Sequence, residues 1–185
     1  SALPNMNGHR AANTASLLPS GQVLICGGTK GNGNNELADV ADLLGTSLNS
    51  TEIFDPATNS WSSGPNLPEP KAGHGAITLQ NVLILLSGCI TYTTIFGINF
   101  PDFSSQASTF DPATGSFSNA GNIRTKRALF AHALLPNGKV AFFGGVGGDI
   151  LNFGPIKKAD VFNPATNSAS GIAPLPADRG FLQAL

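Results

Sequence analysis

The side chains with the clearest chemical potential in this chain are basic residues and histidines that recur at similar places along it. Each basic residue lies just before an apolar run, and the three histidines lie near the starts of such runs. The basic residues are Arg10, Lys71, Lys126, Arg127 and Arg179, and the histidines are His9, His74 and His132. Guanidinium and ammonium groups bind carboxylates through charge-assisted hydrogen bonds. A fold that gathered these cations would therefore hold an acidic sugar or an acidic side chain of a partner.

Catalytic and metal chemistry has less support. No Ser-His-Asp order, phosphate-binding loop or carboxylate pair stands out, so the sequence favours a non-catalytic role without deciding it, and no cofactor is expected. Cys26 and Cys89 lie beside glycines at nearly the same place in neighbouring repeats. Each suits a small buried apolar residue, and the alternative is a disulfide, which needs Cα atoms within ~7 Å. Without a CxxC motif or a histidine at ligand spacing, a metal site is disfavoured.

A repeated segment indicates which elements position these residues. Phe54 to Trp61 reads FDPATNSW, Phe110 to Phe117 reads FDPATGSF, and Phe162 to Ala169 reads FNPATNSA. Self-similarity at about 50 residues is typical of a propeller or a solenoid. In each copy a β-prone run enters a turn of Asp-Pro or Asn-Pro followed by Asn or Gly, which predicts a hairpin.

A second hairpin is predicted upstream of each of these turns. Ala15 to Gly28 and Ala133 to Gly145 align closely, with Pro-Ser-Gly and Pro-Asn-Gly as turns. Their continuous apolar runs suit strands that are buried on both faces. The middle copy, Ala76 to Cys89, has lost the turn glycine and departs at the glycine pair. Two hairpins per copy make a four-stranded antiparallel unit.

The pattern resembles the kelch repeat: an apolar strand ending in Gly27-Gly28, a long connection, the turn at Phe54-Asp55-Pro56, and a strand bearing Trp61. The second copy departs at Ser87-Gly88-Cys89 and the third at Ala169. The resemblance implies an all-β fold, a kelch-type β-propeller segment of three four-stranded blades plus the first strand of a fourth. Within a single unit of residues 1–185, blades are expected at about 9–64, 72–121 and 128–173, with the start of another at about 179–185.

Three blades do not close a propeller, which uses roughly four to eight. An open wedge would expose the apolar flanks of its end blades. Either the chain is part of a longer polypeptide or two copies assemble a six-bladed ring. The first is favoured, because the sequence stops inside an expected strand.

The connections between the second and third strands of each copy are long and differ from one another, so grafted function is expected on their face. The connections Ile90 to Gln106 and Val146 to Lys158 are rich in apolar side chains, which would either fold back over the blades or form a dry contact with a partner. The predicted contact residues are Tyr92, Phe96, Phe100, Phe103, Leu151 and Phe153. The connection Thr29 to Asn49 predicts a short helix with an acidic solvated face, and its spacing does not favour calcium.

On the propeller topology, the basic residues gather at the mouth of the central channel. The predicted channel-mouth cations are Arg10, Lys126, Arg127 and Arg179. The alternative is that an arginine here braces adjacent blades by bonding carbonyl groups, as kelch repeats often do. The resemblance extends to galactose oxidase, but its copper site uses two tyrosines and this chain has only Tyr92. Sialate-epimerising kelch enzymes would need an acid and a base in the channel, and no acidic residue clearly points there.

Composition limits the partners. Charged residues are 11% of the chain and the net charge is −1, against the usual ~25% charged residues, which argues against nucleic acid. Apolar runs are far shorter than the ~20 residues that span a bilayer. Low charge with abundant Ser, Thr, Asn and Gly favours an extracellular or periplasmic protein.

Two functions follow from these observations. The favoured one is a non-catalytic extracellular module that presents apolar loops to a protein partner or to copies of itself. The alternative is part of a carbohydrate-binding or carbohydrate-active propeller that recognises a glycan at the channel mouth.

Overall fold

The computed structural model describes residues 4–30, 47–149 and 152–181, and every regular element among them is a β-strand. The first sheet has the order β1-β2-β3-β4, and all its neighbours are antiparallel. We call it blade 1. Its strands are β1 (Thr14–Leu17), β2 (Val23–Cys26), β3 (Thr51–Asp55) and β4 (Ser60–Ser63).

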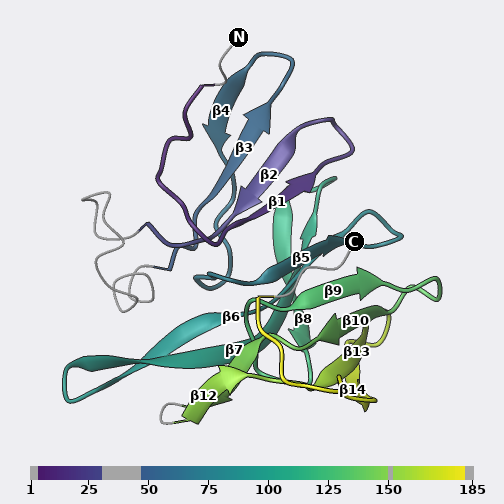
Figure 1. Cartoon of the computed structure of the whole chain (residues 1–185). Coiled ribbons are helices and arrows are strands. Elements are labelled where there is room, and N and C mark those ends of the chain that lie inside the picture. The colour runs from purple at the N-terminus through teal and green to yellow at the C-terminus, as the bar shows by residue number, and fades with distance from the viewer. Residues whose placement is uncertain (1–3, 31–46, 150–151, 182–185) are drawn as a thin grey trace.

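Blade 2 repeats this order as β5-β6-β7-β8, but its two middle strands are much longer. Its strands are β5 (Gly75–Thr78), β6 (Ile84–Ile95), β7 (Ile98–Asp111) and β8 (Ser116–Asn122). A register shift between Ser87 and Cys89 marks the place where the sequence departs from the other copies. Beyond this irregularity β6 and β7 continue as a hairpin that projects from the blade (Figure 1).

Blade 3 has the same order of four strands and an added two-stranded hairpin, β11–β12, between its second and third strands. The blade strands are β9 (Ala131–Leu134), β10 (Val140–Phe143), β13 (Ala159–Asn163) and β14 (Ser168–Ile172). The added strands are β11 (Val146–Asp149) and β12 (Asn152–Pro155). The first strands of successive blades contact one another, β1 with β5 and β5 with β9, so the blades fan out from a shared inner edge.

The core consists of two apolar layers between blades. Strand β6 contributes to both, because its side chains alternate: Ile84 and Leu86 pack toward blade 1, and Leu85 packs toward blade 3. All three are fully buried. The prediction of strands buried on both faces concerns the other two copies, and it holds for β2 and β10. It is wrong for β1, where burial alternates and Leu17 is exposed. Each layer stabilises two blades at once.

The repeated turns use the same backbone conformation in each blade. Asn59, Gly115 and Asn167 each have a positive φ where the outer hairpin closes. The aromatic ring before the turn packs on the one after it in blades 1 and 2, with centroids 5.0 Å apart in both Phe54–Trp61 and Phe110–Phe117. In blade 3 Ala169 takes the second place, so this aromatic contact is missing there.

Main-chain hydrogen bonds also join successive blades at the hub. Ala12, Gly73 and Leu129 share a left-handed conformation two residues after the basic position of each blade. The amide of Gly73 donates to the carbonyl of Ala12 (2.9 Å), and the amide of Leu129 donates to the carbonyl of Gly73 (2.8 Å). The same conformation recurs at Phe181.

These observations confirm the predicted fold class and correct one part of the sequence interpretation. The apolar connections Ile90 to Gln106 and Val146 to Lys158 were expected as loops, but each holds a β-hairpin. The first forms the outer parts of β6 and β7, and the second holds β11 and β12. The helix predicted within Thr29 to Asn49 falls mostly on residues 31–46, outside the described part of the chain. The strand expected at 179–185 is described only to Phe181, and Arg179 pairs there with Ile156. No helix among the described residues has the length and hydrophobicity to cross a bilayer.

Candidate functional site

Arg10, the first predicted channel-mouth cation, is buried within blade 1. Its Nε lies 2.9 Å from Glu52 Oε1, and its Nη1 donates to the carbonyls of Gly27 and Ser50, both at 2.9 Å. The guanidinium thus ties the segment before β1 to the end of β2 and the start of β3. The guanidinium therefore binds groups of its own blade and is not presented to a ligand.

Arg127 makes the equivalent contacts in blade 3. Its Nη1 donates to the carbonyls of Gly144 (2.8 Å) and Lys158 (3.1 Å), and its Nη2 lies 2.5 Å from Asp160 Oδ2. The side chain is fully buried, and burial lowers the pKa of Arg127 while the Asp160 carboxylate opposes that shift. Removing either charge would leave the other buried and unpaired.

Blade 2 holds a lysine at the same place and lacks the carboxylate of its neighbours. Ser108 occupies the position of Glu52 and Asp160 on the third strand. Glu69 supplies the charge instead, with its Oε1 2.5 Å from Lys71 Nζ. Each blade therefore buries one cation, and the anion that neutralises it comes from different elements.

The carbonyl of the same basic residue reaches the previous blade. The amide of Gly28 donates to the carbonyl of Lys71 (2.7 Å), and the amide of Gly145 donates to the carbonyl of Arg179 (2.8 Å). The bracing alternative predicts that an arginine bonds carbonyl groups, and this is correct. The side chain, however, bonds carbonyls of its own blade, whereas the main chain of the basic residue links adjacent blades. Among the predicted cations, only Lys126 and Arg179 are exposed.

Two of the three histidines lie between first strands of neighbouring blades. His74 Nε2 is 2.8 Å from Thr14 Oγ1, and His132 Nε2 is 2.9 Å from the carbonyl of Ala76. Desolvation, with smaller contributions from the charges of Lys71 and His132, lowers the pKa of His74 to about 3. The His74 imidazole is therefore neutral at pH 7 and serves as a contact between blades.

Both cysteines are buried free thiols. Burial raises the pKa of Cys26 to about 12 and that of Cys89 to about 11. The interpretation as small core residues is confirmed, and the disulfide alternative is wrong. In the described ranges, no three His, Cys, Asp or Glu side chains are grouped so that they could hold a metal ion.

The hairpin β6–β7 carries the most exposed aromatic side chain of the described residues. Ile95 pairs with Ile98, so Phe96 and Gly97 form a two-residue turn at its tip. Their φ angles are +50° and +79°, the signs that a type I′ turn requires. Phe96 is fully exposed, and a bulky residue in the left-handed region is strained. The tip thus combines a strained backbone conformation with a solvent-exposed aromatic ring.

The base of this hairpin packs on β11–β12. Phe103 of β7 is buried, and its ring centroid lies 6.3 Å from that of Phe153 on β12. Phe153 keeps 49% of its surface exposed. Phe100 is partly buried, while Leu151 and the side chain of Tyr92 lie outside what the structure describes. The predicted contact residues thus divide into the buried Phe103 and the exposed Phe96 and Phe153.

Sequence reasoning missed a group of exposed cations beside blade 3. Arg124 and Lys158 lie with Lys126 around one pocket. Arg124 follows the outer strand of blade 2, and Lys158 immediately precedes β13. Lys158 lies one residue after Lys157, and no sequence pattern distinguishes which of the two faces the pocket.

Comparisons with known proteins agree with this geometry. The family described as Kelch motif matches residues 10–68. A protein of Arabidopsis thaliana named as an F-box/kelch-repeat protein is 32% identical over 122 residues, which is 64% of this chain and 34% of that protein. The chain thus spans about a third of that relative. The structure of YjhT matches with a TM-score of 0.69 at 16% identity, over 95% of this chain and 55% of that one, which shows likeness of fold.

Proposed function

We propose that this chain, which consists of kelch repeats folded as β-propeller blades, is a protein-binding module whose contact surface is formed by the hairpins β6–β7 and β11–β12. The observation that carries the proposal is Phe96, a fully exposed aromatic residue at a strained turn. Strained backbone and exposed aromatic area both cost free energy in the isolated molecule. Such features are concentrated at functional sites.

The composition of the β6–β7 hairpin supports a protein contact. No residue from Ile90 to Pro101 is charged, and Ile95 is exposed beside Phe96. Interface cores are depleted of charged residues and enriched in aromatic ones. The hairpin therefore has the composition of an interface core although it projects from the blades (Figure 1).

The base of the hairpin supports a rigid presentation of this surface. Because Phe103 is buried against the neighbouring hairpin, the two hairpins hold each other in place. Ordering a flexible segment on binding costs free energy, and a pre-positioned hairpin avoids part of that cost. A protein partner, or a second copy of this chain, would meet a surface that is already formed.

Phe96→Asn tests the proposal, since Asn suits the first position of a type I′ turn. We expect the variant to be at least as stable as the unmodified protein and to lose its interactors. The measurement is quantitative mass spectrometry of proteins retained from the source organism, followed by calorimetry on a purified candidate. Sedimentation velocity of both proteins covers self-association.

Val82→Asn is the matched control, because Val82 is also an exposed apolar residue with a positive φ at a turn. It lies at the opposite end of β6 from Phe96. If the Val82→Asn variant retains the same proteins as the unmodified protein and the Phe96→Asn variant no longer retains them, the result supports the hairpins as the binding surface. An unchanged set of interactors and an unchanged oligomeric state in Phe96→Asn would refute it.

The glycan alternative has weaker support, because Arg10 and Arg127 are buried and bonded to their own blades. Only Lys126 and Arg179 of the predicted set remain available to a ligand. The proposal includes an extracellular or periplasmic location, because the chain has a low content of charged residues. A signal-dependent export assay of the natural polypeptide would test that location.

A further inference from the structure

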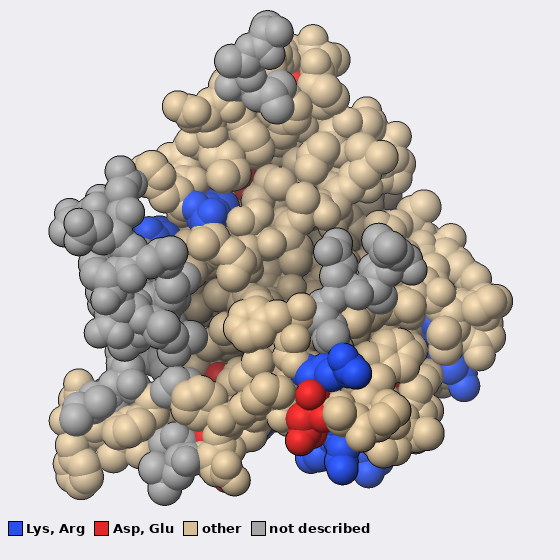
Figure 2. Space-filling model, viewed as in Figure 1, with Lys and Arg blue, Asp and Glu red and all other residues tan. Residues whose placement is uncertain are grey.

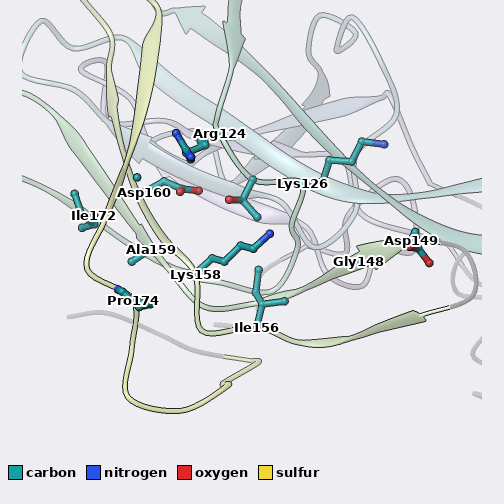
Figure 3. A pocket seen from close by; sticks show the side chains of 12 residues that line it. Arg124, Lys126, Gly148, Asp149, Ile156, Lys158, Ala159, Asp160, Ile172 and Pro174 are labelled. Atoms are coloured by element: carbon teal, nitrogen blue, oxygen red, sulfur yellow. The ribbon is translucent and has the colours of Figure 1, made fainter.

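A pocket of about 790 Å³ lies on blade 3, on the face from which β11–β12 projects (Figure 3). Its walls come from residues 124–126 between blades 2 and 3, from the end of β11, from Ile156 and residues 158–160, and from residues 171–174 around the end of β14. The lining combines cationic and apolar side chains. The cations are Arg124, Lys126 and Lys158, and the apolar residues include Ile156, Ile172 and Pro174.

The pocket carries an excess of positive charge. Its two acidic residues are Asp149 and Asp160, against the three cations Arg124, Lys126 and Lys158. Asp160 is neutralised by the buried Arg127, and Asp149 accepts a hydrogen bond from the amide of Asn152. Lys126 Nζ lies 3.7 Å from Asp102, and more than half of the Lys126 side chain is exposed. Arg124 and Lys158 are exposed, and neither forms an ion pair with any other described residue. Charge is sparse over most of the visible face in Figure 2, so three cations at one pocket are a local concentration.

Hydrogen bonds to main-chain carbonyls anchor the segment that carries Lys158. The carbonyl of Lys158 accepts a hydrogen bond from Arg127, and that of Lys157 accepts one from the amide of Leu175. Gly171 faces Arg124 closely enough that a Cβ added there would lie 3.3 Å from its Nε. The glycine thus gives the guanidinium room against the outer strand. In Figure 3 the Lys158 side chain points toward the segment that carries Arg124 and Lys126, and the Lys126 side chain extends away from it.

We propose that this pocket binds the acidic side chains of an extended peptide segment of the partner. The inference rests on the proposed function, because the pocket borders the hairpin that carries Phe153. Gly148, which lines the pocket, pairs directly with Phe153 across β11–β12. A peptide crossing blade 3 would place a carboxylate between Arg124 and Lys158 and an apolar side chain against Phe153.

The lining favours a peptide over other anions. Ile156, Ile172 and Pro174 give the pocket apolar walls beside its cations, and a peptide offers both kinds of group. Nucleic acid requires an extended basic surface, whereas this chain has a net charge of −1. The volume exceeds what a single phosphate ion would fill.

A hexaglutamate peptide is the probe. Its binding is followed by chemical-shift changes of the backbone amides in the protein at low salt, with hexalysine and inorganic phosphate as parallel titrations. We expect shifts at residues 124–126, 148 and 158–160, and at least about fivefold weaker binding in the variant Arg124→Gln/Lys158→Gln. Raising the salt concentration should weaken binding as well.

Lys139→Gln/Lys157→Gln is the matched control, since it removes the same charge from residues that do not line the pocket. We expect its affinity for hexaglutamate to stay within about twofold of the unmodified protein. Equal loss in the two double variants would show binding to net charge alone and overturn the proposal. Equal affinity for phosphate and hexaglutamate would overturn the assignment to a peptide.

Phe96→Asn separates this inference from the proposed function. The variant should bind hexaglutamate as the unmodified protein does, because Phe96 does not line the pocket. If Phe96→Asn keeps all interactors while the pocket variant loses hexaglutamate, the hairpin proposal fails and the pocket remains a binding site. If hexaglutamate does not bind, the pocket proposal fails regardless of the hairpin.

Discussion

Arg10 and Arg127 show how one residue type at one repeat position can be read in two ways. Both residues carry the charge that a carboxylate ligand needs. Both donate hydrogen bonds to carbonyl groups of their own blade and form an ion pair with a carboxylate of that blade. The sequence could not separate these roles, because they require the same side chain. The partner on the third strand, Glu52 or Asp160, is the signal that could have decided it.

Val82 is the residue at which the sequence departs most clearly from its own repeat. It has a φ of +62° at the turn where the other blades have Gly21 and Gly138. A β-branched residue is strained in this conformation. We predict that Val82→Gly raises the free energy of unfolding by about 1 kcal/mol, measured by urea denaturation.

The converse change provides the check on Val82. A Cβ at Gly21 would meet no atom within 4 Å, so Gly21→Val tests backbone strain without steric overlap. It should lower the free energy of unfolding by about 1 kcal/mol. If both variants leave stability unchanged, left-handed strain at this turn is not a measurable cost.

Among the elements, the first strands of the blades meet through histidines. His74 on the segment entering β5 contacts Thr14 of β1, and its imidazole is held neutral by burial. Its pKa is about 3 in the folded protein and near 6.5 in the unfolded chain. Between these values the unfolded state binds more protons, so stability falls as the pH falls from about 6.5 toward 3.

The prediction for His74 concerns this slope. Between pH 7 and pH 5 the unmodified protein should lose about 2 kcal/mol more stability than His74→Gln, which keeps a hydrogen-bonding group for Thr14 but does not titrate. Urea midpoints at the two pH values give the difference. His9→Gln is the control, since His9 is exposed. Parallel slopes for His74→Gln and the unmodified protein would contradict the role assigned to His74.

The strands and turns were more predictable than the connections between them. Repeated turn residues such as Asp55-Pro56 and Asn163-Pro164 fix the outer hairpins locally, and the apolar runs of β2 and β10 indicate burial on both faces. The β6–β7 extension was not predictable in this way, because its two-residue turn uses Phe96-Gly97 where such turns prefer Asn-Gly. Its stability depends on Phe103 contacting another hairpin, which no local pattern records. The cationic pocket was missed for the same reason, since it joins residues from four segments.

At the scale of the whole molecule, stability lies between blades. Leu85 belongs to the layer shared with Phe130, Val140 and Phe142 of blade 3, and Leu86 belongs to the layer shared with blade 1. The blades are therefore coupled to their neighbours, as in other repeat proteins. One substitution in a layer should affect two blades and leave the remote one less changed.

This coupling predicts different outcomes for two adjacent residues. Leu85→Ala and Leu86→Ala should each cost about 3 kcal/mol, because each removes a fully buried side chain. Native-state hydrogen exchange should then show faster exchange in β10 for Leu85→Ala and in β2 for Leu86→Ala. Identical exchange patterns in the two variants would mean that the blades open as one unit.

The hub contacts bear on how such a molecule can grow and diverge. Ala12, Gly73 and Leu129 differ in side-chain size, yet all share the same left-handed conformation and each forms a main-chain hydrogen bond with a neighbouring blade. The angle between successive blades is thus recorded in backbone geometry. Duplication of one blade unit would transmit that angle to the descendant copy, even after its side chains had changed beyond recognition. In this fold, the angle between blades would therefore record common descent after sequence similarity had been lost.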